Sequence, residues 1–195
     1  RKVEGVYKGK SKTYDFRGKK VAVVMAGNPY TESGDKFSIP DMLANRADIY
    51  NLGDVIGGSD EDFKLSYIEN TLSSNKVLSI LKNKPKEDVY RLVRSAERGE
   101  LMVDGLSSNL QSDQINDVLQ VLKHLIIVRD VILKVNAAYI FSAGVSDEFR
   151  VEPAFKLQGS YRNMNTITEK LAPLISETEV WVIIQSHYEN ECQTL

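Results

Sequence analysis

The stretch from residue 21 to residue 46 constrains this chain most, because it joins a predicted strand to two polar side chains. Residues 21–25, VAVVM, are apolar and mostly β-branched, and polar or turn-forming residues flank them on both sides. Such a short apolar run predicts a strand that is buried on both faces. Asn28 follows after Ala26 and Gly27, and Pro29 prevents the strand from continuing. The pattern therefore places an amide side chain at the tip of a buried strand.

A short helix is predicted beyond that strand. After a polar loop, Pro40 and Asp41 form a plausible helix start, and residues 42–45 continue the helix up to Arg46. The segment thus delivers an amide from a strand tip and a guanidinium from the end of a short helix.

This arrangement resembles the second half of an AAA+ ATPase core, in particular the MoxR-like branch that includes bacterial DNA-repair-type ATPases. In that branch a β-hairpin precedes the strand that ends in the sensor 1 residue, and residues 3–7 and 12–16 would form that hairpin here. Asn28, followed by Pro29, matches sensor 1. Arg46 falls where the family places its arginine finger, although Ala47 stands where the family usually has Phe.

The chain carries no convincing phosphate-binding loop of its own. Residues 5–11, GVYKGKS, have three residues between the glycines, whereas a P-loop has four and follows a buried strand. No apolar strand ends in Asp-Glu, as a Mg²⁺-holding Walker B segment would. Since the chain also begins at Arg1 without Met, we expect a C-terminal fragment whose phosphate and Mg²⁺ sites lie upstream.

The glycines at 57 and 58 mark the best domain boundary. We expect residues 1–57 to be the C-terminal part of the AAA+ α/β subdomain, with residues 48–56 as a further strand. Residues 58–195 would form a mainly α-helical lid bundle. The resulting fold class is an α/β remnant of a P-loop AAA+ core, made of a hairpin and one or two core strands, followed by that bundle. Residues 65–109 exceed a minimal lid and are a candidate insertion.

Apolar residues at helical spacing support the bundle. They predict helices over residues 60–72, 85–98 and 115–135, and the last of these is apolar on nearly all sides, as expected of a central helix. Residues 141–153 have the composition of a loop. A final helix is predicted to begin at Ser176, because Glu179 completes a capping box with it.

A second informative motif lies at residues 157–165, LQGSYRNMN. Ser160 is a candidate N-cap, which places Arg162 in the first turn of a helix. The helix dipole disfavours a cation there, so this arginine requires an anionic partner. AAA+ lids carry their sensor 2 arginine near the start of a lid helix. The resemblance therefore implies that Arg162 contacts the γ-phosphate of bound ATP.

Composition sets the class of protein. The chain has 195 residues, a net charge of −2 and 42% hydrophobic residues, which suits a globular protein with a core. A single cysteine excludes an internal disulfide, and no apolar run reaches the about 18–20 residues that span a bilayer. The two histidines lie far apart without metal-ligand spacing, so we predict no metal site. We expect a cytoplasmic protein without membrane contact, and the near-neutral charge argues against a strongly basic nucleic-acid surface.

The resemblance implies a function for the full-length protein: ATP hydrolysis coupled to remodelling of a macromolecular partner. Asn28 would orient the attacking water, Arg46 would act on the nucleotide of a neighbouring subunit, and Arg162 would bind the nucleotide of its own subunit. ATP and Mg²⁺ are then the cofactors of the full-length protein, which forms a homo-oligomeric ring. The 195-residue chain alone is expected to bind no nucleotide and to be inactive. We expect a protein partner or substrate, and the resemblance alone suggests DNA as a further candidate.

Each of these residues also has a simpler interpretation. Asn28 could cap a strand end through an Asx turn, and Arg46 could be a surface arginine. Arg162 could pair with Glu169, or with the acidic pair Asp147-Glu148. At the level of function, the alternative is a non-catalytic helical protein-interaction module attached to an ATPase.

Overall fold

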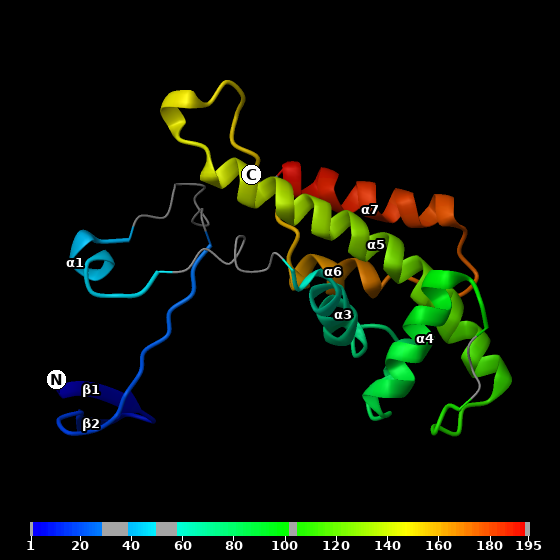
Figure 1. Ribbon diagram of the computed structural model, residues 1–195, viewed down its shortest axis with the longest axis horizontal. Coiled ribbons are helices and arrows are strands. Elements are labelled where there is room, and N and C mark those ends of the chain that lie inside the picture. The colour runs from blue at the N-terminus through cyan, green and yellow to red at the C-terminus, as the bar shows by residue number, and fades with distance from the viewer. Residues whose placement is uncertain (1, 29–38, 50–57, 102–104, 194–195) are drawn as a thin grey trace.

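The computed structural model describes residues 2–28, 39–49, 58–101 and 105–193. Within these residues a two-stranded antiparallel sheet and a short helix precede a bundle of helices (Figure 1). This agrees with the coarse expectation of a small β-containing start followed by a mainly helical part. The division at residue 57 stays a prediction.

The hairpin consists of β1, Lys2–Tyr7, and β2, Lys10–Asp15. The strands pair in register from Lys2 opposite Asp15 to Tyr7 opposite Lys10. Lys8 and Gly9 form the two-residue turn, and both have positive φ, 50° and 73°. That geometry belongs to a type I′ turn, whose twist matches the twist of paired strands. The predicted hairpin is therefore present, with β2 starting two residues earlier than expected.

The predicted core strand at residues 21–25 is wrong for this structure. The segment has no regular secondary structure, and its side chains are exposed, with Val23 78% and Val24 92% accessible. A strand needs a neighbour for its backbone hydrogen bonds, and the two strands of the described residues pair with each other. The second predicted strand, 48–56, falls mostly outside the described residues, as do Pro29 and the loop after it.

The short predicted helix is present as α1, Asp41–Ala44. Pro40 occupies its N-cap position, and none of its residues is buried. Arg46 follows one residue beyond the C-cap Asn45, so the helix carries the arginine as the sequence indicated.

The bundle surrounds one long helix, α5 (Figure 1). Its helices are α3, Asp60–Thr71; α4, Lys86–Arg98; α5, Ser112–Gly144; α6, Tyr161–Thr168; and α7, Glu177–Cys192. Two short 3₁₀ helices, η1 at Leu78–Leu81 and η2 at Asp147–Phe149, lie in the connections. The helices predicted at 60–72 and 85–98 and the one starting after Ser176 are confirmed. No helix among the described residues combines the length and apolarity that crossing a membrane requires.

In the part of the chain that the structure describes, the hydrophobic core lies in this bundle. α5 contributes its centre through Val118, Leu122, Leu125, Val128 and Ile132, all fully buried. The segment from 65 to 109 adds further members of the same cluster, namely Ile68, Leu78, Leu81, Leu92 and Val93. Burial of these apolar side chains is the main force that holds the bundle together.

α5 extends beyond the predicted end at residue 135 and into the predicted loop at 141–153. Tyr139 and Ser142 in its last turns are buried. Arg150 donates from Nη2 to the carbonyls of Ser142 and Val145, at 2.8 and 3.1 Å. This guanidinium satisfies carbonyls that a helix end leaves free, which stabilises the additional turns.

Candidate functional site

The three predicted site residues do not lie together. Asn28 is exposed in irregular chain, Arg46 is exposed after α1, and Arg162 is exposed in the first turn of α6. Figure 1 shows α1 well apart from α6. Among the described residues no hydrogen bond or ion pair joins any two of the three.

The start of α6 has the local structure that the sequence predicted. Ser160 is the N-cap, and its Oγ accepts a hydrogen bond from the Asn163 backbone N–H at 3.3 Å. The Asn163 side chain accepts in turn from the Ser160 backbone N–H at 3.3 Å, which completes a capping box. Within the described part of the chain, Arg162 forms no ion pair with Glu169 or Glu148. No hydrogen bond or ion pair to another described residue holds its guanidinium, which is exposed at the N-terminal end of a capped helix.

Two tyrosines fix this helix start on α3. The rings of Tyr67 and Tyr161 stack with centroids 4.3 Å apart. Tyr67 donates its hydroxyl to the Gly159 carbonyl at 2.7 Å, and Ser66 Oγ lies 2.8 Å from the Tyr161 hydroxyl. Burial raises the pKa of Tyr67 to about 12, so this donor keeps its proton at neutral pH. The turn that carries Arg162 is thus held from one side by aromatic stacking and hydrogen bonds.

A polar cluster holds the same turn from α7. Asn163 is buried, and its Nδ2 donates to Glu191 Oε1 at 2.5 Å and lies 3.0 Å from His187 Nε2. Burial lowers the pKa of His187, and the Glu191 carboxylate opposes that shift. A neutral His187 can accept the hydrogen bond from Asn163. The sequence analysis considered the histidines only as metal ligands and missed this cluster, because only the packing of α6 against α7 brings its members together.

Asn75 fixes the other end of α6. Its Nδ2 donates to the carbonyls of Thr168 and Leu171, both at 2.9 Å. Its Oδ1 accepts from the backbone N–H groups of Val77 and Leu78. All polar atoms of this buried amide side chain are therefore used in joining the end of α6 to η1. α6 is short, yet it is held firmly at both ends.

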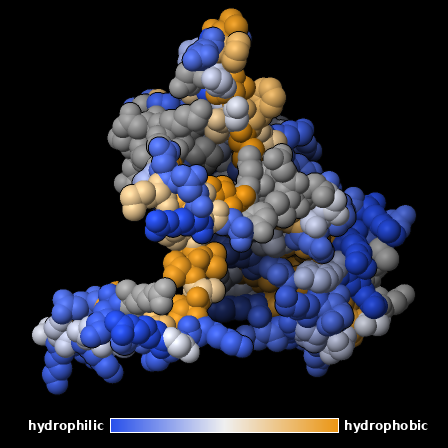
Figure 2. Space-filling view, turned by 60° about the vertical axis from the view of Figure 1, so that its left-hand side comes forward, coloured by the Kyte–Doolittle hydropathy of each residue, from blue (hydrophilic) through white to orange (hydrophobic). Residues whose placement is uncertain are grey.

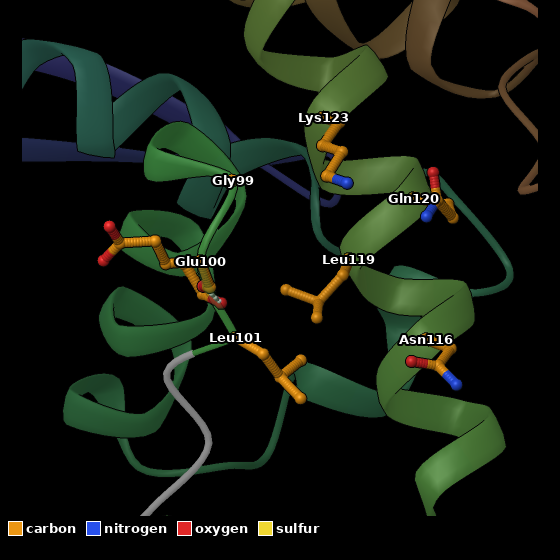
Figure 3. A pocket seen from close by; sticks show the side chains of 8 residues that line it. Gly99, Glu100, Leu101, Asn116, Leu119, Gln120 and Lys123 are labelled. Carbon is orange, nitrogen blue, oxygen red and sulfur yellow. Dashed lines mark hydrogen bonds between the residues drawn. The ribbon is translucent and has the colours of Figure 1, made fainter.

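A separate hollow lies between the C-terminal end of α4 and the first half of α5 (Figure 3). It has a volume of about 170 Å³, and Leu101 and Leu119 point toward one another across it. Its lining is Ser95, Gly99, Glu100, Leu101, Asn116, Leu119, Gln120 and Lys123. None of the predicted site residues belongs to this lining.

The start of α6, which carries Arg162, can bind a ligand through electrostatic interactions. The described residues contain no group of three His, Cys, Asp or Glu side chains that could hold a metal ion. An exposed guanidinium beside a helix N-terminus suits a phosphate or carboxylate oxygen.

No protein-family model, curated protein or solved structure matches this chain. A function must therefore be argued from the residues themselves.

Proposed function

We propose that this chain is the C-terminal part of an AAA+ ATPase of the MoxR-like group, with the helical bundle as its lid and Arg162 as the residue that contacts the γ-phosphate of ATP. The observation that carries the proposal is the position of Arg162. It is an exposed guanidinium without an ion pair among the described residues, in the first turn of a helix held at both ends.

The position of Arg162 suits a role in phosphoryl transfer. Charge in phosphoryl transfer spreads over the γ-phosphoryl oxygens, and catalysis consists largely of positioning and electrostatic stabilisation. The planar guanidinium of Arg162 suits those oxygens. Because α6 is bound to both α3 and α7, loss of the γ-phosphate from Arg162 would move the bundle as a unit, and this motion would do work on a macromolecular partner.

Asn28 and Arg46 complete the proposal from outside the bundle. Asn28 would orient the attacking water, and Arg46 would reach the nucleotide of a neighbouring subunit in a cytoplasmic homo-oligomeric ring. ATP would be the bound cofactor of the full-length protein. The described residues do not fit a Mg²⁺ site, and the proposal assigns this chain no metal ligand.

The test uses the full-length ATPase and substitutes Arg162→Ala, with Arg94→Ala as the matched control. Arg94 is another exposed arginine, on α4. Losing one charged hydrogen bond to phosphate lowers ATP turnover by about 10- to 100-fold, whereas the control keeps wild-type activity. The unmodified 195-residue chain, tested alone, shows no turnover above a mock preparation. Full activity in Arg162→Ala, or Mg²⁺-dependent turnover by the chain alone, overturns the proposal.

One observation favours the alternative of a non-catalytic interaction module. Leu174, Trp181 and Val182 are large apolar side chains exposed in or just before the first half of α7, and exposed apolar side chains suit protein contacts. The two functions differ in what Arg162 does. Protection of Arg162 from arginine-specific modification by ATP in the full-length protein supports the lid, and a modification rate independent of ATP supports the module.

A further inference from the structure

The two faces of the hairpin differ in chemistry. Side chains alternate between the faces of a strand, so the observed register places cross-strand partners on the same face. One face carries Tyr7, Lys10, Lys12 and Tyr14, together with Val3 and Gly5. We call Tyr7, Lys10, Lys12 and Tyr14 the tyrosine–lysine face.

The opposite face carries both acidic side chains of the hairpin. Glu4 and Asp15 lie there with Lys2, Val6, Ser11 and Thr13. This face therefore carries two acids against one lysine, whereas the charged side chains of the tyrosine–lysine face are both cations. This separation of the acidic side chains from Lys10 and Lys12 onto opposite faces distinguishes the hairpin from a surface loop whose charges are mixed.

The tyrosines of this face are exposed rather than packed into a core. Tyr7 is 75% and Tyr14 45% accessible. Tyr14 lies over the bare backbone of Gly5, since a Cβ there would be 3.3 Å from Tyr14 Cε2. Lys12 Nζ is 5.3 Å from the Tyr14 ring centroid, and Lys8 Nζ is 5.4 Å from that of Tyr7. Each ring is thus presented to solvent with an ammonium group beside it.

Positive charge is concentrated in this part of the chain. Residues 1–20 contain eight lysines and arginines against two acids, although the whole chain has a net charge of −2. Figure 1 shows the hairpin projecting away from the bundle, and in Figure 2 the arm at the lower left is largely hydrophilic. The near-zero net charge of the whole chain is therefore the sum of a basic segment, residues 1–20, and an acidic remainder. Such an asymmetry of charge favours polyanionic partners for the basic segment.

We propose that the tyrosine–lysine face binds single-stranded nucleic acid. Lys10 and Lys12 would contact phosphates, and Tyr7 and Tyr14 would stack on unpaired bases, which is how sequence-tolerant single-strand binding is built. A duplex hides its base faces from such rings. An anionic membrane surface would favour large apolar side chains beside the lysines, and on this face Val3 is the sole aliphatic one. The proposal does not rest on the ATPase function.

The test measures fluorescence anisotropy of a labelled 20-nucleotide oligo(dT) with the 195-residue chain at 50 mM salt. Saturable binding is expected. Lys10→Gln with Lys12→Gln removes two phosphate contacts, which should flatten the slope of log K against log[salt] by about 1.4. The matched control, Lys76→Gln with Lys82→Gln, removes the same charge from two exposed lysines of the bundle and keeps the wild-type slope.

Tyrosine substitutions separate stacking from charge. Tyr7→Leu with Tyr14→Leu retains apolar strand residues but removes the rings. Affinity should fall between about 5- and 150-fold per lost stack, with the salt slope unchanged. A charge-only surface would show no loss of affinity in this variant.

Several outcomes overturn the proposal. These are no binding of the oligonucleotide by the wild-type chain, an equal loss in the Lys76/Lys82 control, or wild-type affinity in the tyrosine variant. Equal or tighter binding of phosphatidylserine vesicles or polyglutamate through the same four residues also overturns it and assigns the face to a membrane or an acidic protein. Circular dichroism of each variant confirms that the bundle is folded. Because the assay needs no ATP, its failure leaves the ATPase proposal untouched.

Discussion

His124 lies in α5 with its imidazole buried, and its Nδ1 has no hydrogen-bond partner among the described residues. Burial lowers the pKa of this imidazole, while a hydrogen bond with the backbone of Ala172 acts in the opposite direction. His187 is shifted the same way by burial. Both histidines therefore hold a proton less tightly in the folded chain than in the unfolded chain.

This shift predicts how stability depends on pH. Because the folded pKa lies below the unfolded value of 6.5, the unfolded chain binds more protons as pH falls through that value. The contribution of the two histidines to the free energy of unfolding is therefore fully present above about pH 6.5 and is lost as the pH falls below that value toward their lowered folded pKa. Urea unfolding at pH 7.5 and pH 5.5 measures the difference.

The control variant is His124→Gln with His187→Gln, in which this decrease should be much smaller. Carboxylates such as Glu69 and Glu179 have lowered pKa values, so their contribution is lost only below their ordinary value of 4.5. An equally steep decrease in the double variant would show that other groups are responsible.

At the residue scale, the sequence predicts what local chemistry decides. Ser160 as N-cap and Arg162 in the first turn follow from neighbours within a few positions, and both are confirmed. The burial of His124 and the pairing of Asn163 with Glu191 depend on residues far away in the sequence. No spacing rule within one helix contains that information.

The chain just before α6 passes very close to the backbone of α5. A Cβ at Gly159, just before α6, would lie 2.0 Å from the Ile132 carbonyl oxygen and 2.5 Å from the Asn136 backbone nitrogen. Both of these atoms belong to the backbone of α5, so neither can move aside as a flexible side chain would. Only glycine allows the chain to pass here.

Gly159→Ala is therefore expected to lower the free energy of unfolding by about 3 kcal/mol, the upper range for overpacking. Gly144→Ala is the matched control, because nothing lies within 4 Å of a Cβ there. That change should alter stability by no more than about 1 kcal/mol. Urea unfolding of both variants decides the matter, and equal effects would mean that α6 does not sit this close to α5.

The helices and strands that could be predicted are those whose sequence pattern depends only on nearby residues. Helical spacing located α3 and α4 within a residue or two, and Gly99 ends α4 in the left-handed region as a C-cap glycine does. Residues 21–25 have the composition of a buried strand, but among the described residues no strand pairs with them. A strand is a property of a sheet, so its sequence pattern alone could not determine the outcome.

The whole molecule is divided into a part that holds the core and a part that does not. Among the described residues, every member of the hydrophobic core comes from the bundle. The described residues before 50 include no buried side chain, although residues 21–25 are apolar. Val21, Val23, Val24 and Met25 thus form an exposed apolar segment, which favours association with another chain.

This division predicts different behaviour for the two parts. A chain of residues 58–195 should unfold in urea with the same midpoint as residues 1–195, because the described residues before 50 contribute no member to the core. Sedimentation velocity should show concentration-dependent self-association of residues 1–195 and a monomer for residues 58–195. In the longer chain, Val24→Lys with Met25→Lys should restore the monomer, because buried charge disfavours an apolar contact. A lower midpoint for 58–195 would place residues 1–57 in the folded core. Unchanged association of the lysine variant would place the contact elsewhere.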